Sequence, residues 1–234
     1  ETLQAYLVCY YERTIKEADN LPMNDILQYR MEHNYKISKE QHGDDFDVSL
    51  EEMKEFFQDG CTIIDEFLKR KSGYFPKKNT ELVGIEIGLN HKVTDNIDFR
   101  GYMDVVIHNK TTGRVKIIDI KTSTMGWNKY MKADKNKTNQ LLLYKYFMSE
   151  EREIPIDKID VEYLILKRRL YENFDYPQKR LQTFSPASGK PSINKVMKRL
   201  QEFMDECFDE DGNVIDKDYV KCEKHKKCRL CKDL

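Results

Sequence analysis

The sequence predicts an α/β protein in which a mixed central β-sheet is flanked by helices, with further helical segments towards both ends of the chain. Two observations predict this class. Apolar residues follow a helical period in the first third of the chain and then change to the two-residue alternation of strands. A strongly apolar helix next separates the third predicted strand from the fourth, which favours helices on the faces of the sheet.

Residues 1 to about 72 have the spacing of helices. One predicted helix begins at Ser49, because Glu52 follows three residues later and the two can form a capping box. Its apolar residues are spaced for one buried face: Phe56, Ile63, Ile64, Phe67 and Leu68. The polar segment 36–48 is expected to be a loop between helices.

The rest of the chain alternates strands and helices. Strands are expected at 82–89, 99–108, 115–120 and 159–166, and helices at 140–149 and 193–208. The second and third strands are joined by a hairpin turn that contains Gly113. We expect one structural domain with three parts, namely an N-terminal helical segment (1–75), a core (76–190) and a C-terminal helix with a basic, Cys-rich tail (191–234).

Composition limits the class of protein. Of the 234 residues, 39% are hydrophobic and 35% are charged, which is typical of a soluble protein with a charged surface. No apolar run approaches the roughly 20 residues that span a bilayer, and no secretion leader is seen, so we expect a cytoplasmic protein without a membrane partner. A net charge of −1 excludes bulk coating of nucleic acid, but lysines gather locally at Lys129, Lys132, Lys135 and Lys137.

Two carboxylates and a lysine mark the end of the second and third strands. Asp119 and Lys121 are two residues apart, so they share one face of a strand, while Ile118 and Ile120 turn towards the core. Asp104 lies on the partner strand across the hairpin and can reach the same point. The alternative is an ordinary exposed ion pair between Asp119 and Lys121, worth roughly 0 to 1 kcal/mol.

Hydrolysis of phosphodiesters would explain this trio. Two carboxylates, together with the backbone carbonyl of Ile120, can hold Mg²⁺ or Mn²⁺, which prefer oxygen ligands. Such an ion polarises a phosphate and lowers the pKa of a bound water. Lys121 would orient that water or stabilise the charge that builds up on the phosphate.

The helix that follows carries Gln140 and Tyr144, four residues apart and therefore on one face. In one interpretation Gln140 bonds near the metal or the DNA backbone, and Tyr144 positions Lys121 or stacks near the substrate. In the other, Tyr144 is a core aromatic residue and Gln140 caps the helix or lies on the surface.

In this order and spacing, the residues resemble the RecB-like branch of the PD-(D/E)xK nuclease superfamily, which includes recombination exonucleases, CRISPR adaptation nucleases and many phage-encoded exonucleases. The match runs through Gly101-x-x-Asp104, Asp119-Ile-Lys121-Thr-Ser and Gln140-x-x-x-Tyr144, and Trp127-Asn-Lys-Tyr130 looks most like the phage members. It covers residues 82–170 and implies a restriction-endonuclease-like core.

The resemblance implies roles for individual residues. Asp104 and Asp119 would be metal ligands, Lys121 the catalytic lysine, and Gln140 with Tyr144 the motif after it. Glu86 sits where such nucleases often carry a glutamate, although strand alternation could equally leave it facing solvent. These nucleases also carry a histidine ligand on an early helix, and because neither His33 nor His42 has a matching context, we expect that histidine upstream of residue 1.

Three cysteines gather near the end of the sequence: Cys222, Cys228 and Cys231. The Cys-x-x-Cys spacing of the last two is typical of an iron–sulfur or Zn²⁺ site. Several RecB-like nucleases carry a [4Fe–4S] cluster here, which we favour over Zn²⁺. The alternative is a basic tail with reduced thiols.

Together these features predict a Mg²⁺- or Mn²⁺-dependent exonuclease that acts on DNA ends or single-stranded DNA in recombination, repair or phage genome metabolism, with a protein partner in a recombination or replication complex. If the gene belongs to a phage, the host cytoplasm is the expected location. Trp127, Lys129, Tyr130 and Lys132 would contact DNA, although Trp127 could equally anchor a loop. The competing hypothesis is a catalytically inactive nuclease-fold protein that acts as a nucleic-acid-binding or assembly module.

Overall fold

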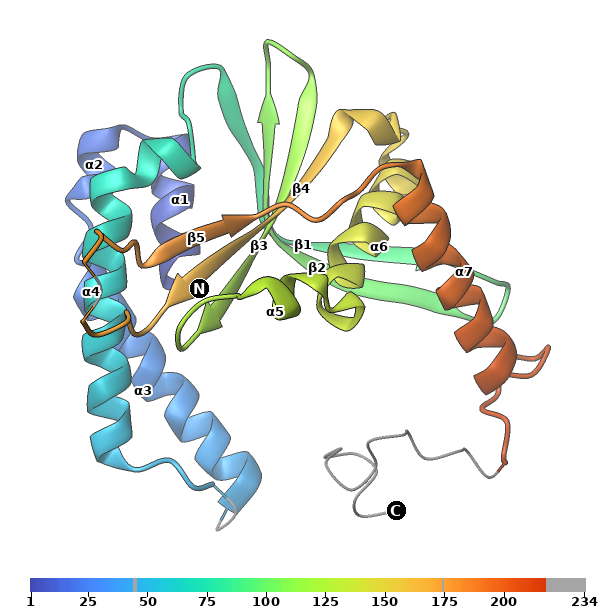
Figure 1. The fold of residues 1–234 in the computed structure, drawn as a ribbon, viewed down its shortest axis with the longest axis horizontal. Coiled ribbons are helices and arrows are strands. Elements are labelled where there is room, and N and C mark those ends of the chain that lie inside the picture. Colours follow the sequence, from blue (N-terminus) through green and yellow to red (C-terminus); the bar gives the residue numbers. More distant parts are fainter. Residues whose placement is uncertain (44–45, 174, 218–234) are drawn as a thin grey trace.

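The computed structural model describes residues 1–43, 46–173 and 175–217, and these form a sheet with helices packed on both of its faces (Figure 1). Helices α1 to α4 lie on one side, and α6 and α7 lie on the other. This arrangement confirms the predicted α/β class with a mixed sheet. Among the described residues, no helix combines the length and apolarity needed to cross a membrane.

The N-terminal segment contains four helices: α1 (Thr2–Glu12), α2 (Ile15–Asp19), α3 (Met23–His42) and α4 (Leu50–Tyr74). The predicted capping box at the start of α4 is present, since Ser49 and Glu52 bond to each other's backbone amides. The prediction of a loop over 36–48 was wrong in its first half, because α3 continues to His42. That half contains lysine, glutamate and glutamine, which favour a helix without any apolar pattern.

The described residues form a five-stranded sheet in the order β1-β2-β3-β4-β5. Its strands are β1 (Thr80–Lys92), β2 (Asp98–Asn109), β3 (Arg114–Ser123), β4 (Ile159–Lys167) and β5 (Leu181–Phe184). Only β3 and β4 run parallel; the other neighbours are antiparallel. A parallel pair needs a crossover between its strands, and here α6 provides it.

The remaining elements are α5 (Lys129–Ala133), α6 (Lys135–Arg152), the 3₁₀ helix η2 (Ile156–Lys158) and α7 (Lys190–Cys207). The sequence predicted α6 and α7 but missed α5 and β5, which have five and four residues. Elements this short carry too few repeats for a hydrophobic period to be recognised.

Two hydrophobic cores fill the space on either side of the sheet. The first packs α1 and α4 against one face and includes Leu7, Phe67 and Ile118. The second packs α6 against the opposite face and includes Ile117 and Phe147. Because Ile117 and Ile118 are neighbours that face different cores, β3 is buried on both sides, as expected for a central strand.

The sheet divides at one point, between β2 and β3. Their pairing begins at Asn109 with Arg114 and ends at Val105 with Ile118. Beyond that point the hairpin of β1 and β2 turns away, whereas β3 continues beside β4 as far as Ser123 (Figure 1). The last residues of β3 therefore have a neighbouring strand on one edge only, and this fork between β2 and β3 is where the predicted acidic residues lie.

Candidate active site

Asp104 lies at the fork and is the first residue of β2 beyond the segment that pairs with β3. Its Oδ2 accepts a hydrogen bond from the backbone amide of Ile120 at 2.7 Å. This amide would have bonded to β2 if the two strands had stayed paired, so the carboxylate replaces a bond of the ladder. The N–H and C=O of one strand residue point to the same side, so the carbonyl of Ile120 also faces the fork.

Asp119 and Lys121 share a face of β3, as predicted. Asp119 is 1% exposed, and Lys121 is half-buried. The Nζ of Lys121 donates to Oδ1 of Asp119 at 3.2 Å and lies 2.9 Å from Oδ2. That second contact is an ion pair without hydrogen-bond alignment, and Oδ2 accepts no hydrogen bond from any described residue. A buried carboxylate oxygen without a donor is suited to a cation.

The charges of Asp104, Asp119 and Glu86 influence one another. Burial raises the pKa of Asp119 to about 6, which the ammonium of Lys121 opposes and the charges of Asp104 and Glu86 reinforce. Burial also raises the pKa of Asp104; the hydrogen bond from Ile120 counteracts this, and the charge of Glu86 adds to it. Glu86 therefore destabilises the ionised forms of both aspartates, and Asp104 destabilises that of Asp119; a bound cation would reverse these effects.

Glu86 on β1 lies opposite Asp104, between the paired residues Ile85 and Ile87. Its φ of 50° is in the left-handed region, which is strained for a residue other than glycine. As a result Ile85 and Ile87 face different cores although they are two residues apart. Glu86 is solvent-accessible, but its charge still contributes to raising the pKa values of Asp104 and Asp119.

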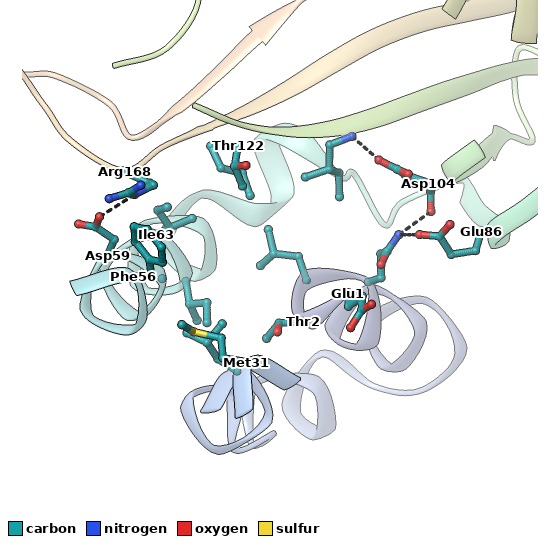
Figure 2. Close-up of a pocket in the computed structure, with 17 residues that line it drawn as sticks. Glu1, Thr2, Met31, Phe56, Asp59, Ile63, Glu86, Asp104, Thr122 and Arg168 are labelled. Carbon is teal, nitrogen blue, oxygen red and sulfur yellow. Dashed lines mark hydrogen bonds and ion pairs between the residues drawn. The ribbon is translucent and has the colours of Figure 1, made fainter. Parts of the chain in front are cut away.

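Gln4 holds Glu86 in place and was missed by the sequence analysis. It is buried on α1, and its Nε2 donates to Oε1 of Glu86 and, at 3.3 Å, to the backbone carbonyl of Asp104. One amide thus ties α1 to both β1 and β2 (Figure 2). The signal that could have identified it is a polar residue beside Leu3 and Leu7, on the apolar face of the helix.

Gln140 and Tyr144 share a face of α6, and Nε2 of Gln140 donates to the Tyr144 hydroxyl at 2.9 Å. The Tyr144 ring is buried against Gly101 of β2, where an added Cβ would lie 2.6 Å from Cε1 of the ring. Gly101 is therefore needed so that α6 can approach the strand. This packing favours the interpretation of Tyr144 as a core residue, while its action on Lys121 stays a prediction.

Trp127 is buried, with its ring against Tyr163 and Phe184. The backbone N–H of Trp127 donates to Oε1 of Gln182, and Nε2 of Gln182 donates to the backbone carbonyl of Trp127. This arrangement favours the loop-anchor alternative, since a buried ring offers no face to a DNA base. Tyr130 is 73% exposed, so among the two aromatic residues proposed to contact DNA it is the accessible one.

Several lysines follow or precede Tyr130 closely in the sequence, on α5 and at the start of α6. Lys129 is over the Tyr130 ring, Lys132 over Phe184 and Lys137 over Trp127. Within the described part of the chain none of these three forms an ion pair with a carboxylate. No carboxylate of the described residues therefore neutralises these three ammonium groups.

The predicted cysteine site lies outside the described residues, since Cys222, Cys228 and Cys231 all fall within 218–234. Across residues 1–43, 46–173 and 175–217, no group of three or more His, Cys, Asp or Glu side chains is already close enough to hold a metal ion. Two carboxylates with a backbone carbonyl are a smaller set, which suits Mg²⁺ because this ion keeps several waters and takes further ligands from substrate phosphates.

Similar proteins were found at the levels of family and of structure. None of the curated proteins matches this sequence. Among solved structures, a candidate exonuclease from Eubacterium rectale is 13% identical over 89% of this chain and 71% of its own, with a TM-score of 0.46. The protein SSO0001 is 14% identical over 77% of this chain and 71% of its own, with a TM-score of 0.35.

The family match is the stronger finding. A model of the PD-(D/E)XK nuclease superfamily matches residues 12–232, which include the fork and all of the sheet. The matched segment contains Asp104, followed by Asp119 and Lys121. Since this match covers nearly the whole sequence, the chain belongs to the PD-(D/E)XK nuclease superfamily.

Proposed function

We propose that the protein is a Mg²⁺- or Mn²⁺-dependent deoxyribonuclease that removes nucleotides from DNA ends or single-stranded DNA, with Asp104, Asp119 and Lys121 as its catalytic residues. The observation that carries the proposal is the fork. There, two carboxylates and a lysine lie where β3 is no longer paired with β2. One buried carboxylate oxygen has no hydrogen-bond donor among the described residues.

The donor set fits a hard divalent cation. Asp104, Asp119 and the carbonyl of Ile120 would supply the oxygen ligands, and Glu86 lies near enough to influence both aspartates. When bound, such an ion polarises the scissile phosphate and provides an activated water. The raised pKa values of both aspartates indicate that they gain from its positive charge.

Lys121 supplies the positive charge that the carboxylates lack. Its ion pair with Asp119 fixes the ammonium beside the fork instead of leaving it free in solvent. From there it can orient the attacking water or stabilise charge on the phosphate as the bond to the leaving oxygen breaks. Without it, three carboxylates would repel a polyanionic substrate.

The surface for DNA is proposed to run over α5 and the start of α6. Lys129 and Lys132 would neutralise phosphates, and exposed Tyr130 offers a ring on which a base can stack. Trp127 would support this surface from beneath, since it is buried. Action in recombination, repair or phage genome metabolism, with a protein partner, is the context that this activity would serve.

The cysteines Cys222, Cys228 and Cys231 are proposed to bind a [4Fe–4S] cluster, with Zn²⁺ as the second candidate. The test is the iron and zinc content, and the visible absorbance, of protein purified without oxygen. Colourless protein that contains neither metal would exclude the site without affecting the proposed nuclease.

The function is tested by incubating the protein with linear and circular DNA, each single- or double-stranded, in Mg²⁺, in Mn²⁺ and in a chelator. We expect metal-dependent loss of the linear forms only, because an exonuclease requires an end. Loss of circular DNA would show an endonuclease instead. DNA binding without any hydrolysis would favour an inactive binding module.

The site is tested in the same assay with Asp119→Ala and Lys121→Ala. A matched control is Lys116→Ala, because Lys116 lies on the same strand but pairs with Glu162, away from the fork. Both site variants should be inactive and the control active. Equal degradation by all of them would refute the assigned residues.

A further inference from the structure

A cavity of about 600 Å³ adjoins the proposed site, between the sheet and helices α1, α3 and α4 (Figure 2). Glu86 and Asp104 lie at one end of it, and Asp59 with Arg168 lies at the other. Its volume is within the range of pockets that bind small organic groups. A group that entered the cavity would therefore lie next to a phosphate held at the fork.

The charge of the cavity opposes a phosphate inside it. Four lining residues are acidic, namely Glu1, Asp59, Glu86 and Asp104. Among the side chains of the described lining residues, that of Arg168 is the single cation, and it is already paired with Asp59 at 3.0 Å and with Glu55 at 3.2 Å. Its guanidinium also lies over the Phe56 ring. A polyanionic backbone would be repelled by these carboxylates and would find no unpaired cationic side chain in the described lining.

The walls suit a neutral, flat group. Apolar side chains from the three helices and the sheet form a large part of the lining, among them Leu27, Met31, Phe56, Ile63 and Leu166. Methionine adapts to aromatic rings through its polarisable sulfur. Gln4 and Thr122 add polar atoms that could meet the edge of a heterocycle. A nucleobase, which is aromatic and uncharged with polar edges, matches this lining.

We propose that this cavity receives the unpaired base of the nucleotide beside the scissile phosphate, while the phosphates stay outside and run towards the lysines of α5 and α6. The proposal rests on the proposed nuclease function and specifies its substrate as a strand with a single-stranded or frayed end. A paired base cannot enter, because it would first have to leave the stack and lose its partner.

The first test needs no variant of the cavity. Binding of single-stranded oligonucleotides to the Lys121→Ala protein in Mg²⁺ is compared with binding of the same strands carrying an abasic nucleotide at each of the terminal positions in turn. One abasic position should weaken binding about five- to a hundredfold, the range that a single stacked base contributes. Equal affinity for all of these strands would overturn the proposal.

The second test fills the cavity. Met31→Trp adds a ring on α3, away from Glu86 and Asp104, and Tyr29→Trp is the control because Tyr29 is on the same helix but 69% exposed. Met31→Trp should weaken binding of intact strands to the level of the abasic strand and leave the abasic strand unaffected. Tyr29→Trp should change neither. An equal loss for both strands would contradict a base site.

A third measurement reports the base directly. With 2-aminopurine at the sensitive position, its emission should change on binding to the Lys121→Ala protein and not on binding to Lys121→Ala that also carries Met31→Trp, whose thermal unfolding is followed to confirm that it is folded. Unchanged emission with the Lys121→Ala protein would overturn the inference. If cleavage depends on Lys121 but a missing base has no effect on binding, the base site is refuted and the nuclease is not. Absence of both binding and cleavage would refute the proposed function as well.

Discussion

The carboxylate of Asp104 takes the place of a strand, because its Oδ2 accepts the hydrogen bond from the Ile120 amide that a paired β2 would otherwise receive. The point where the sheet divides and the point where the acidic residues gather are thus one feature. Asp104 has two roles: its carboxylate oxygen accepts a hydrogen bond, and its negative charge is proposed to bind the metal ion. Substitutions can separate these two roles.

Asp104→Asn should keep the acceptor and lose the charge, since an amide oxygen can still receive the Ile120 N–H. Its stability should be close to that of the parent, while Mn²⁺ binding is lost. Asp104→Ala should also leave the amide of Ile120 without a partner, at a cost of about 1–3 kcal/mol. Urea unfolding and calorimetric titration with Mn²⁺ measure the two effects; equal destabilisation by both variants would show that the hydrogen bond contributes little.

Asp119 should make the metal-free protein less stable as pH rises. An unfolded aspartate has a pKa of about 3.9, whereas burial raises the pKa of Asp119 in the fold to about 6. Between these values the folded chain keeps a proton that the unfolded chain has released, so stability falls as pH rises through this window and is constant above it.

The matching variant is Asp119→Asn, which cannot ionise. In a chelator near pH 7 it should be more stable than the parent by about 3 kcal/mol, and near pH 4 the two should be similar. Urea unfolding at both pH values provides the comparison. An advantage of the same size at both would mean that ionisation of Asp119 is not its cause.

A larger residue at position 101 should destabilise the protein while Tyr144 is present, because its Cβ would lie 2.6 Å from the ring. Gly101→Ala is expected to cost about 1–3 kcal/mol, as overpacking does elsewhere. In a Tyr144→Leu background the same substitution should cost much less. A double-mutant cycle in urea measures the coupling, and purely additive effects would contradict the close contact.

Glu86 should be dispensable for folding but needed for activity. Glycine adopts the left-handed conformation of this position without strain, so Glu86→Gly should be at least as stable as the parent, although it loses the bond from Gln4. Hydrolysis should fall, and the Mn²⁺ concentration for half-maximal rate should rise. Full activity at low Mn²⁺ would remove Glu86 from the metal site.

The sequence predicted the parts of the site that depend on local periodicity. Two-residue alternation placed Asp119 and Lys121 on one face of β3 and brought Asp104 to the partner strand, and the structure has this arrangement. Helix α6 was predicted because residues 140–149 within it are strongly apolar.

Contacts between distant segments could not be predicted in this way. Gln4 bonds to Glu86 from 82 residues away, and no local pattern predicts that these two residues pair. The left-handed backbone of Glu86 also breaks the alternation that strand prediction assumes. For Trp127 the sequence left two roles open, and burial against Tyr163 and Phe184, which come from later strands, favours the anchor.

The most direct test of the central claim is the rate at which Lys121→Ala releases nucleotides from an end-labelled single strand in saturating Mn²⁺, relative to the parent and to Lys116→Ala. Loss of a charge that stabilises the transition state should lower this rate about 10²–10³-fold, with Lys116→Ala close to the parent. A Lys121→Ala protein that cleaves as fast as the parent would contradict a catalytic site at the fork between β2 and β3.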